Sequence, residues 1–233
     1  TTYTVVVHDG CSTPPDSATV TITINPLPVI SFTADTLNGC APVCTSFNNL
    51  TTLASGGIAS WSWNFGDGSG LDTAKSPSHC FTTPGSYTVS LDVTSDSGCI
   101  SSLTIPDMIT VYSYPIANFT FGPQPTTILD PEISFTDKSS DAYGIATWAW
   151  TFGDMFDGSS TQQNPTYSYQ DTGTYCATLK VTNIHGCVDS TTECLVISPA
   201  FTLYIPDAFS PIGDGINDVF TPSGNFIHNF KMY

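Results

Sequence analysis

Cysteines and short acidic motifs are the residues of this 233-residue sequence that could do chemistry. Eight cysteines could either bind a metal ion or pair in disulfides, and they are Cys11, Cys40, Cys44, Cys80, Cys99, Cys176, Cys187 and Cys194. Only Cys40 and Cys44 are closely spaced, and only His79 lies beside a cysteine, so the spacing does not fit a zinc knuckle. We therefore favour disulfides, which form outside the cytosol.

Two acidic motifs could bind calcium or take part in catalysis. Asp67 and Asp154 each follow a Phe-Gly pair, where the alternative, which we favour, is an aspartate that stabilises a turn. The run from Asp214 to Asp218 places oxygen donors around a glycine, as calcium loops do, although it lacks the later glutamate of an EF-hand. Calcium is thus the one cofactor that the sequence suggests, against the alternative of a hydrogen-bonded turn, and its ligands would be Asp214, Asn217 and Asp218.

Familiar catalytic patterns are missing from the sequence. There is no nucleophile elbow, zinc-protease helix, P-loop or dinucleotide-binding glycine pattern, and the four histidines are scattered: His8, His79, His185 and His228. His79 could form a thiol–imidazole pair with Cys80, but a disulfide at Cys80, which we expect, excludes that pair. We expect His185 to lie in a hairpin turn and face water, and we expect no enzyme.

The charge of the chain restricts its partners. It carries 20 Asp and Glu against four Lys and Arg, all of them lysine, for a net charge of -16. Nucleic-acid binding needs clustered basic residues, so it is excluded, and an anionic membrane surface is disfavoured. No stretch approaches the roughly 18 apolar residues of a membrane-spanning helix. Only Glu132 and Glu193 among the acids are glutamates, and this turn-forming composition favours an all-β protein.

A repeat divides the chain. Three blocks recur at an offset of 87 or 88 positions, namely Trp61–Asp67 in Trp148–Asp154, Pro77–Val89 in Pro165–Ala177, and Gly98-Cys99 in Gly186-Cys187. We predict two copies of one domain at 26–113 and 114–199, because separated blocks at one offset are hard to obtain by chance. Residues 1–25 are predicted to form the last hairpin of a truncated Ig-like domain, and residues 200–233 are a different segment.

Alternation with a period of two characterises each copy. Trp61, Trp63 and Phe65 share one face of a predicted strand, and similar runs are separated by turn residues about every ten positions. This pattern predicts tandem antiparallel β-sandwiches, with one tryptophan of each pair in the core. The second tryptophan could be exposed and stack on a polysaccharide.

These blocks resemble the PKD (polycystic kidney disease) domain. The first copy carries its signature in Asn64–Gly68, Ser76–Phe81 and Gly85–Val89. The second copy departs from it, because Asp154 is followed by an enlarged turn, Met155–Gly158. The resemblance implies an Ig-like sandwich that acts as a spacer or binding module and not as an enzyme.

Disulfide pairing follows from the expected strand positions, although four cysteines in one copy allow three connectivities. We predict the pairs Cys40–Cys99, Cys44–Cys80 and Cys176–Cys194. The second copy has no cysteine where Cys40 has its counterpart, so we expect Cys187 to be unpaired. The partner of Cys11 is expected upstream of the sequence.

A dense motif opens the last segment, and its residues are Ile205, Pro206, Asp207, Ala208, Phe209, Pro211, Gly213, Asp214, Gly215, Asn217, Asp218 and Phe220. With Asp207 in place of the usual asparagine, this motif resembles the opening of the gliding-motility-associated carboxy-terminal domain of Bacteroidota, the type B sorting domain of type IX secretion cargo. The resemblance implies export by the type IX translocon, recognition by a PorP/SprF-like outer-membrane protein and retention at the cell surface. Because the family continues with tryptophan-containing segments that this sequence does not reach, we expect the sorting domain to be incomplete here.

Three functions are consistent with these features. The first is the carboxy-terminal part of a large extracellular adhesin of gliding motility or adhesion, attached to the outer membrane, in which the repeats are spacers. The second is the non-catalytic end of a secreted enzyme that degrades polysaccharide or protein. The third is a calcium-dependent binding module. Because no signal peptide opens the chain, we expect an internal or carboxy-terminal piece of a larger exported protein.

Overall fold

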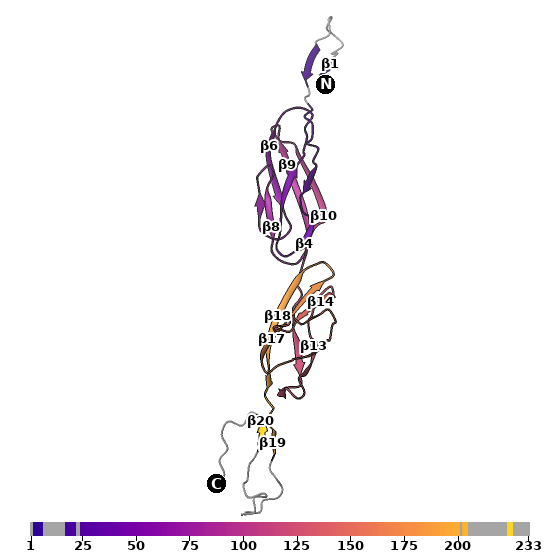
Figure 1. The fold of residues 1–233 in the computed structure, drawn as a ribbon. Coiled ribbons are helices and arrows are strands. Elements are labelled where there is room, and N and C mark those ends of the chain that lie inside the picture. Colours follow the sequence, from indigo (N-terminus) through magenta and orange to yellow (C-terminus); the bar gives the residue numbers. More distant parts are fainter. Residues whose placement is uncertain (1, 7–16, 22–23, 201, 205–222, 226–233) are drawn as a thin grey trace, which may run out of the picture. The chain divides into compact units, whose positions relative to one another are not determined.

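Strands and loops make up all of the chain that the structure describes, and the predicted all-β class is confirmed (Figure 1). The structure is a computed structural model that describes residues 2–6, 17–21, 24–200, 202–204 and 223–225. The chain divides after Tyr112 into two units, which are treated separately below. Within these described ranges, no helix is long and apolar enough to cross a membrane.

Two short hairpins flank the sandwiches in the sequence. Strands β1 (Thr2–Val6) and β2 (Ser17–Thr21) pair antiparallel, with Tyr3 opposite Val20, and their place in a truncated Ig-like domain stays a prediction. Strands β19 (Thr202–Tyr204) and β20 (Ser223–Asn225) pair antiparallel as well.

The first sandwich has two sheets. Its larger sheet has the order β4-β10-β9-β6-β7, with bounds β4 (Asn38–Cys40), β6 (Ile58–Asn64), β7 (Leu71–Asp72), β9 (Gly85–Ser95) and β10 (Ile100–Tyr112). Its smaller sheet has the order β3-β5-β8, with bounds β3 (Phe32–Ala34), β5 (Val43–Asn49) and β8 (Ser78–Phe81).

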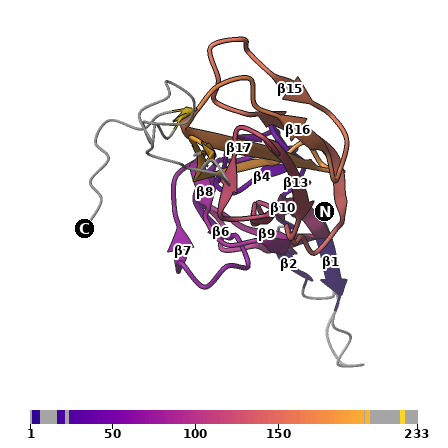
Figure 2. The same ribbon diagram turned by 60° about the horizontal axis from the view of Figure 1, so that its bottom comes forward.

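The second sandwich repeats this topology strand for strand, and several of its strands are labelled in Figure 2. The order of its larger sheet is β12-β18-β17-β14-β15, with bounds β12 (Thr126–Thr127), β14 (Ile145–Thr151), β15 (Ser159–Ser160), β17 (Gly173–Asn183) and β18 (Val188–Ser198). The smaller sheet is β11-β13-β16, with bounds β11 (Phe119–Gly122), β13 (Glu132–Asp137) and β16 (Thr166–Ser168).

One edge of each larger sheet differs from the purely antiparallel prediction. Strand β4 pairs parallel with β10, placing Cys40 beside Tyr112, and β12 pairs parallel with β18. These edge strands have only three and two residues. A strand that short shows no alternation of polar and apolar residues, so the sequence pattern could not indicate it.

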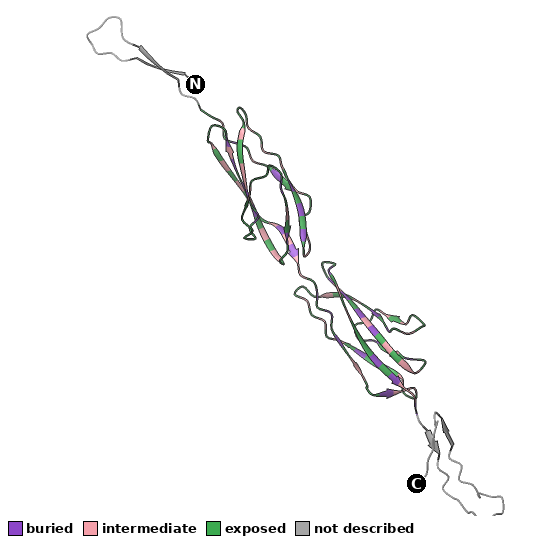
Figure 3. Ribbon diagram, turned by 90° about the vertical axis from the view of Figure 1, so that its left-hand side faces the viewer, coloured by how far each residue is buried: buried purple, intermediate pink, exposed green. Residues whose placement is uncertain are grey.

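Each core is built around one tryptophan. Trp63 and Trp150 are 0% and 1% exposed, and Figure 3 shows buried and exposed residues alternating along the long strands. Phe32 meets Trp63 edge-on at 4.9 Å between ring centroids, and Phe119 meets Trp150 at 5.0 Å. Because a buried indole N–H needs an acceptor, each donates to a backbone carbonyl oxygen, of Ala74 and Gln162 respectively.

Candidate functional site

The turn after β6 holds the first acidic motif. Gly66 has φ +76, and a Cβ there would lie 2.4 Å from the carbonyl oxygen of Thr88, so only glycine fits. Asp67 comes next, and its Oδ1 accepts hydrogen bonds from the backbone N–H of Ser69 at 3.1 Å and from its hydroxyl at 2.6 Å. These bonds close the turn.

His79 completes this cluster from strand β8 of the smaller sheet. Its Nε2 donates to Asp67 Oδ2 at 2.6 Å, and its ring stacks on Phe65 at 4.1 Å between centroids. Burial raises the pKa of the Asp67 carboxyl, but the hydrogen bonds from Ser69 and His79 outweigh it and lower the pKa to about 2. The carboxylate is therefore charged and held within the turn.

The second copy builds the same cluster with a different residue. Tyr167 takes the place of His79, stacks on Phe152 at 4.1 Å, and donates its hydroxyl to Asp154 Oδ2. Asp154 Oδ1 accepts from the backbone of Gly158 at 3.0 Å. Burial, and then the hydrogen bond to Asp154, raise the pKa of Tyr167 to about 12. Burial also raises the pKa of Asp154, but the hydrogen bonds from Tyr167 and the backbone outweigh it and lower that pKa.

These contacts support the turn-stabilising interpretation of both aspartates. Each carboxylate oxygen already accepts a hydrogen bond from within its own domain. Among the residues that the structure describes, no three His, Cys, Asp or Glu side chains gather into a group that could hold a metal ion.

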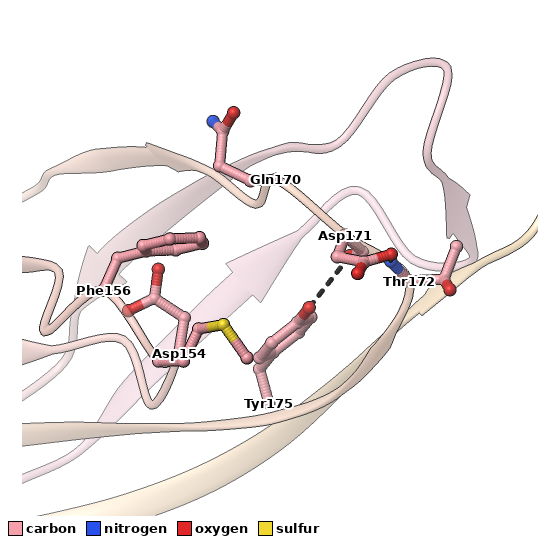
Figure 4. A pocket seen from close by; sticks show the side chains of 7 residues that line it. Asp154, Phe156, Gln170, Asp171, Thr172 and Tyr175 are labelled. Carbon is pink, nitrogen blue, oxygen red and sulfur yellow. Dashed lines mark hydrogen bonds between the residues drawn. The ribbon is translucent and has the colours of Figure 1, made fainter.

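A cavity of about 240 Å³ opens beside the enlarged turn of the second domain (Figure 4). The turn supplies Asp154, Met155 and Phe156, the segment before β17 supplies Gln170, Asp171 and Thr172, and β17 itself supplies Tyr175. Met155 is 86% exposed and Phe156 is 65% exposed. Burial, followed by the charges of Asp171 and Asp154, raises the pKa of Tyr175.

The second tryptophan of each pair is not an exposed platform. Trp61 and Trp148 are partly buried and pack against the cores. Trp148 Nε1 also donates to Asp137 Oδ2 at 2.7 Å. A ring that is partly covered by its own domain offers little of its face to a sugar. The structure therefore does not favour these tryptophans as a polysaccharide-binding site.

Two of the three predicted disulfides are present. Cys44 bonds to Cys80 across β5 and β8, and Cys176 bonds to Cys194 across β17 and β18, each pair directly opposite in register. The disulfide at Cys80 excludes a thiol–imidazole pair with His79, as expected. His185 is exposed, also as expected.

The predicted pair Cys40–Cys99 is wrong. Cys99 is a free, half-buried thiol, whereas Cys40 belongs to a disulfide, as does Cys187, which we had expected to be unpaired. Cys40 lies beside Tyr112 at one end of β10, and Cys99 precedes Ile100 at the other end. A strand of this length separates them by roughly 40 Å, far beyond the roughly 4.4–6.8 Å between Cα atoms that a disulfide requires.

The predicted sorting residues and calcium ligands lie outside the described residues. They fall within 205–222, as Cys11 and His8 fall within 7–16 and His228 within 226–233. Their roles remain sequence-based predictions.

Two disulfide-stapled Ig-like sandwiches of one topology define a class of modular extracellular proteins, since cystines form outside the cytosol. The sequence matches the PKD domain family over residues 25–111 and 113–197, which is most of the chain. The chain therefore belongs to the PKD domain family, whose domains are non-catalytic modules typical of extracellular proteins.

Three solved structures are similar to parts of this chain. The PKD1 domain of Vibrio anguillarum Epp is 27% identical, with 37% of this chain and 96% of that one covered and a TM-score of 0.33. The PKD1 domain of the Vibrio cholerae metalloprotease PrtV is 28% identical, with 36% and 98% covered and a TM-score of 0.33. A 1.5-MDa bacterial ice-binding adhesin is 14% identical, with 85% and 73% covered and a TM-score of 0.41. No function is carried over at these TM-scores.

Sequence reasoning missed the cavity as a site. It identified Met155–Gly158 as an enlarged turn, but it did not bring Asp171 and Tyr175 to the same place. The available signal was a pair of large apolar residues in a turn whose first-copy counterpart is Gly68-Ser69-Gly70.

Proposed function

We propose that this chain is part of a large cell-surface adhesin that is exported by a type IX secretion system. In this proposal the PKD domains are spacers that set the reach of the adhesin. The segment from residue 200 directs export and retention at the outer membrane, through the translocon and a PorP/SprF-like protein. Gliding motility or adhesion is the process it serves.

The observation that supports this proposal best is the change in the sequence at residue 200. Up to that point the chain repeats one non-catalytic sandwich, each copy with its own cross-strand disulfide. From Ile205 to Phe220 it instead carries a dense match to a sorting domain. A spacer needs stability without an active site, and an exported protein needs a sorting signal that another protein recognises.

A pair of deletions in the native protein tests this division of labour. Removing everything from residue 200 to the carboxyl terminus should abolish surface display, measured by antibody labelling of intact cells. Removing residues 114–199, the second PKD domain, is the matched control and should leave display unchanged, because the address is intact.

Two results would contradict the proposal. Full display without the segment from residue 200 would exclude its role in export and retention. A catalytic domain elsewhere in the same polypeptide would favour the alternative, in which these modules accompany a secreted polysaccharide- or protein-degrading enzyme.

A further inference from the structure

The cavity of the second PKD domain has features that the sandwich itself does not need. Its volume of about 240 Å³ lies below the roughly 300–1,000 Å³ of pockets for drug-sized ligands, so it suits one side chain or one sugar ring. Figure 4 shows Phe156 and Asp154 on the turn, Asp171 on the loop before β17, and Tyr175 on β17.

Comparison of the two copies shows which features of the cavity both domains share and which occur only in the second domain. The Tyr175 hydroxyl donates to the carbonyl oxygen of Asp171 at 2.9 Å, and in the first copy Tyr87 donates to Thr83 at 2.6 Å. This bond is common to the fold. The residues that differ are the exposed apolar pair and the acidic and amide side chains, for which the first copy has Gly68, Ser69, Thr82 and Thr83.

The turn exposes two adjacent large apolar side chains. Met155, at 86%, is the most exposed large apolar side chain in the described chain, and Phe156 beside it is 65% exposed. The core does not require them, because the first copy closes the equivalent turn with Gly68 and Ser69. Adjacent exposed apolar side chains beside a cavity favour an interaction site.

The charge at the cavity selects the ligand. Its lining includes Asp154 and Asp171 and no lysine or histidine, within a chain of net charge -16. Asp154 already accepts hydrogen bonds on both oxygens, and Asp171 accepts one from the backbone of Thr172 at 2.7 Å. Both side chains are acidic, and the exposed ring of Phe156 offers a π face, so the surface complements a planar cation.

We propose that this cavity binds an arginine side chain presented by a partner protein. The guanidinium would lie against Phe156 and Met155 and be held by the carboxylate of Asp171. Arginine fits better than lysine because its flat, weakly hydrated cation stacks on aromatic rings. The inference goes beyond the spacer role, because it makes the second PKD domain a contact point, and it does not depend on the route of export.

Methyl NMR on the intact 233-residue chain tests the proposal. Met155 lines the cavity, and Met108 in the first domain is an internal control. The probe is a capped Gly-Gly-Arg-Gly-Gly peptide, and its control contains citrulline, which is a neutral isostere of arginine. We expect a saturable shift of the Met155 methyl signal at roughly millimolar concentration, weakened about tenfold with citrulline, and no shift at Met108.

Variants show whether the named residues hold the peptide. Phe156→Ala should abolish saturation, and its exposed position leaves folding unaffected. Asp171→Asn should weaken binding by about threefold to fivefold. Asp92→Asn, which removes the same charge from an exposed site in the first domain, should have no effect.

Three outcomes would overturn the proposal. They are the absence of a saturable shift at Met155, equal binding of the arginine and citrulline peptides, and tighter binding of the neutral sugar cellohexaose than of the arginine peptide. The last would assign the cavity to a polysaccharide.

Discussion

At the scale of single residues, the two domains stabilise the same turn with different side chains. His79 and Tyr167 occupy equivalent positions, stack on equivalent phenylalanines, and bind equivalent aspartates. What they share is a flat ring that carries a hydrogen-bond donor at its far end. The turn therefore depends on geometry and on a charged acceptor, and not on one particular side chain.

The close approach of Gly66 to the Thr88 carbonyl predicts a large effect of a single methyl group. Gly66→Ala should destabilise the first domain by about 3 kcal/mol, from roughly 1–2 kcal/mol of left-handed strain and a further clash with backbone. Gly68 has φ +81 but open space around it, so Gly68→Ala should cost only about 1–2 kcal/mol. Urea unfolding followed at the Met108 methyl group measures both values. Equal losses would contradict the predicted clash.

The lowered pKa of Asp67 predicts how acid affects the first domain. Since about 2 lies below the ordinary value of 3.8, the stabilisation from this carboxylate is complete above pH 3.8 and is lost as the pH falls toward 2. The free energy of unfolding of the first domain, followed at the Met108 methyl signal, should therefore fall less steeply over this pH range in Asp67→Asn than in the parent chain. Parallel pH profiles would show that Asp67 is not the titrating group.

At the scale of elements, each domain places its cross-strand disulfide in a different sheet. Cys44–Cys80 joins strands of the smaller sheet in the first domain, and Cys176–Cys194 joins strands of the larger sheet in the second. The bonded residues are direct register partners in both cases. A cross-strand disulfide can thus form in either sheet, provided that the strand register places the two cysteines directly opposite each other.

Removal of these disulfides should destabilise each domain separately. The bonds span 36 and 18 residues. Loop-closure entropy then predicts a loss of about 3–4 kcal/mol for Cys44→Ser with Cys80→Ser, and about 0.6 kcal/mol less for Cys176→Ser with Cys194→Ser. The methyl signals of Met108 and Met155 report the two unfolding transitions. A loss at Met155 as large as that at Met108 in the first variant would contradict independent stabilisation.

The sequence was sufficient to predict strands in which polar and apolar residues alternate. It was not sufficient to predict contacts between residues that lie far apart along the chain. Alternation around Trp61 and Trp63 identified the strands, and reflection through the turn before Cys187 paired Cys176 with Cys194. The prediction for Cys40 was wrong because no sequence pattern indicated the short parallel strand β4. That strand places Cys40 beside Tyr112, at the opposite end of β10 from Cys99. The cavity was missed for the same reason, since Phe156 and Asp171 meet only through the fold.

At the scale of the molecule, the described domains have the properties of stable building blocks. Each has its own core around a buried tryptophan, its own disulfide and the same strand order. Both belong to a family of non-catalytic modules. These properties are consistent with the two roles that we propose, namely export and retention for the segment after residue 199 and binding for the cavity of the second domain.

Fusion of that segment to an unrelated protein tests the central claim most directly. Residues 200 to the native carboxyl terminus would be joined to a fluorescent protein carrying its own signal peptide and expressed in the native bacterium. We predict fluorescence on the surface of intact cells, and its loss in a mutant without the type IX translocon. Fluorescence that stays inside the cell, or that reaches the surface equally without the translocon, would contradict the claim.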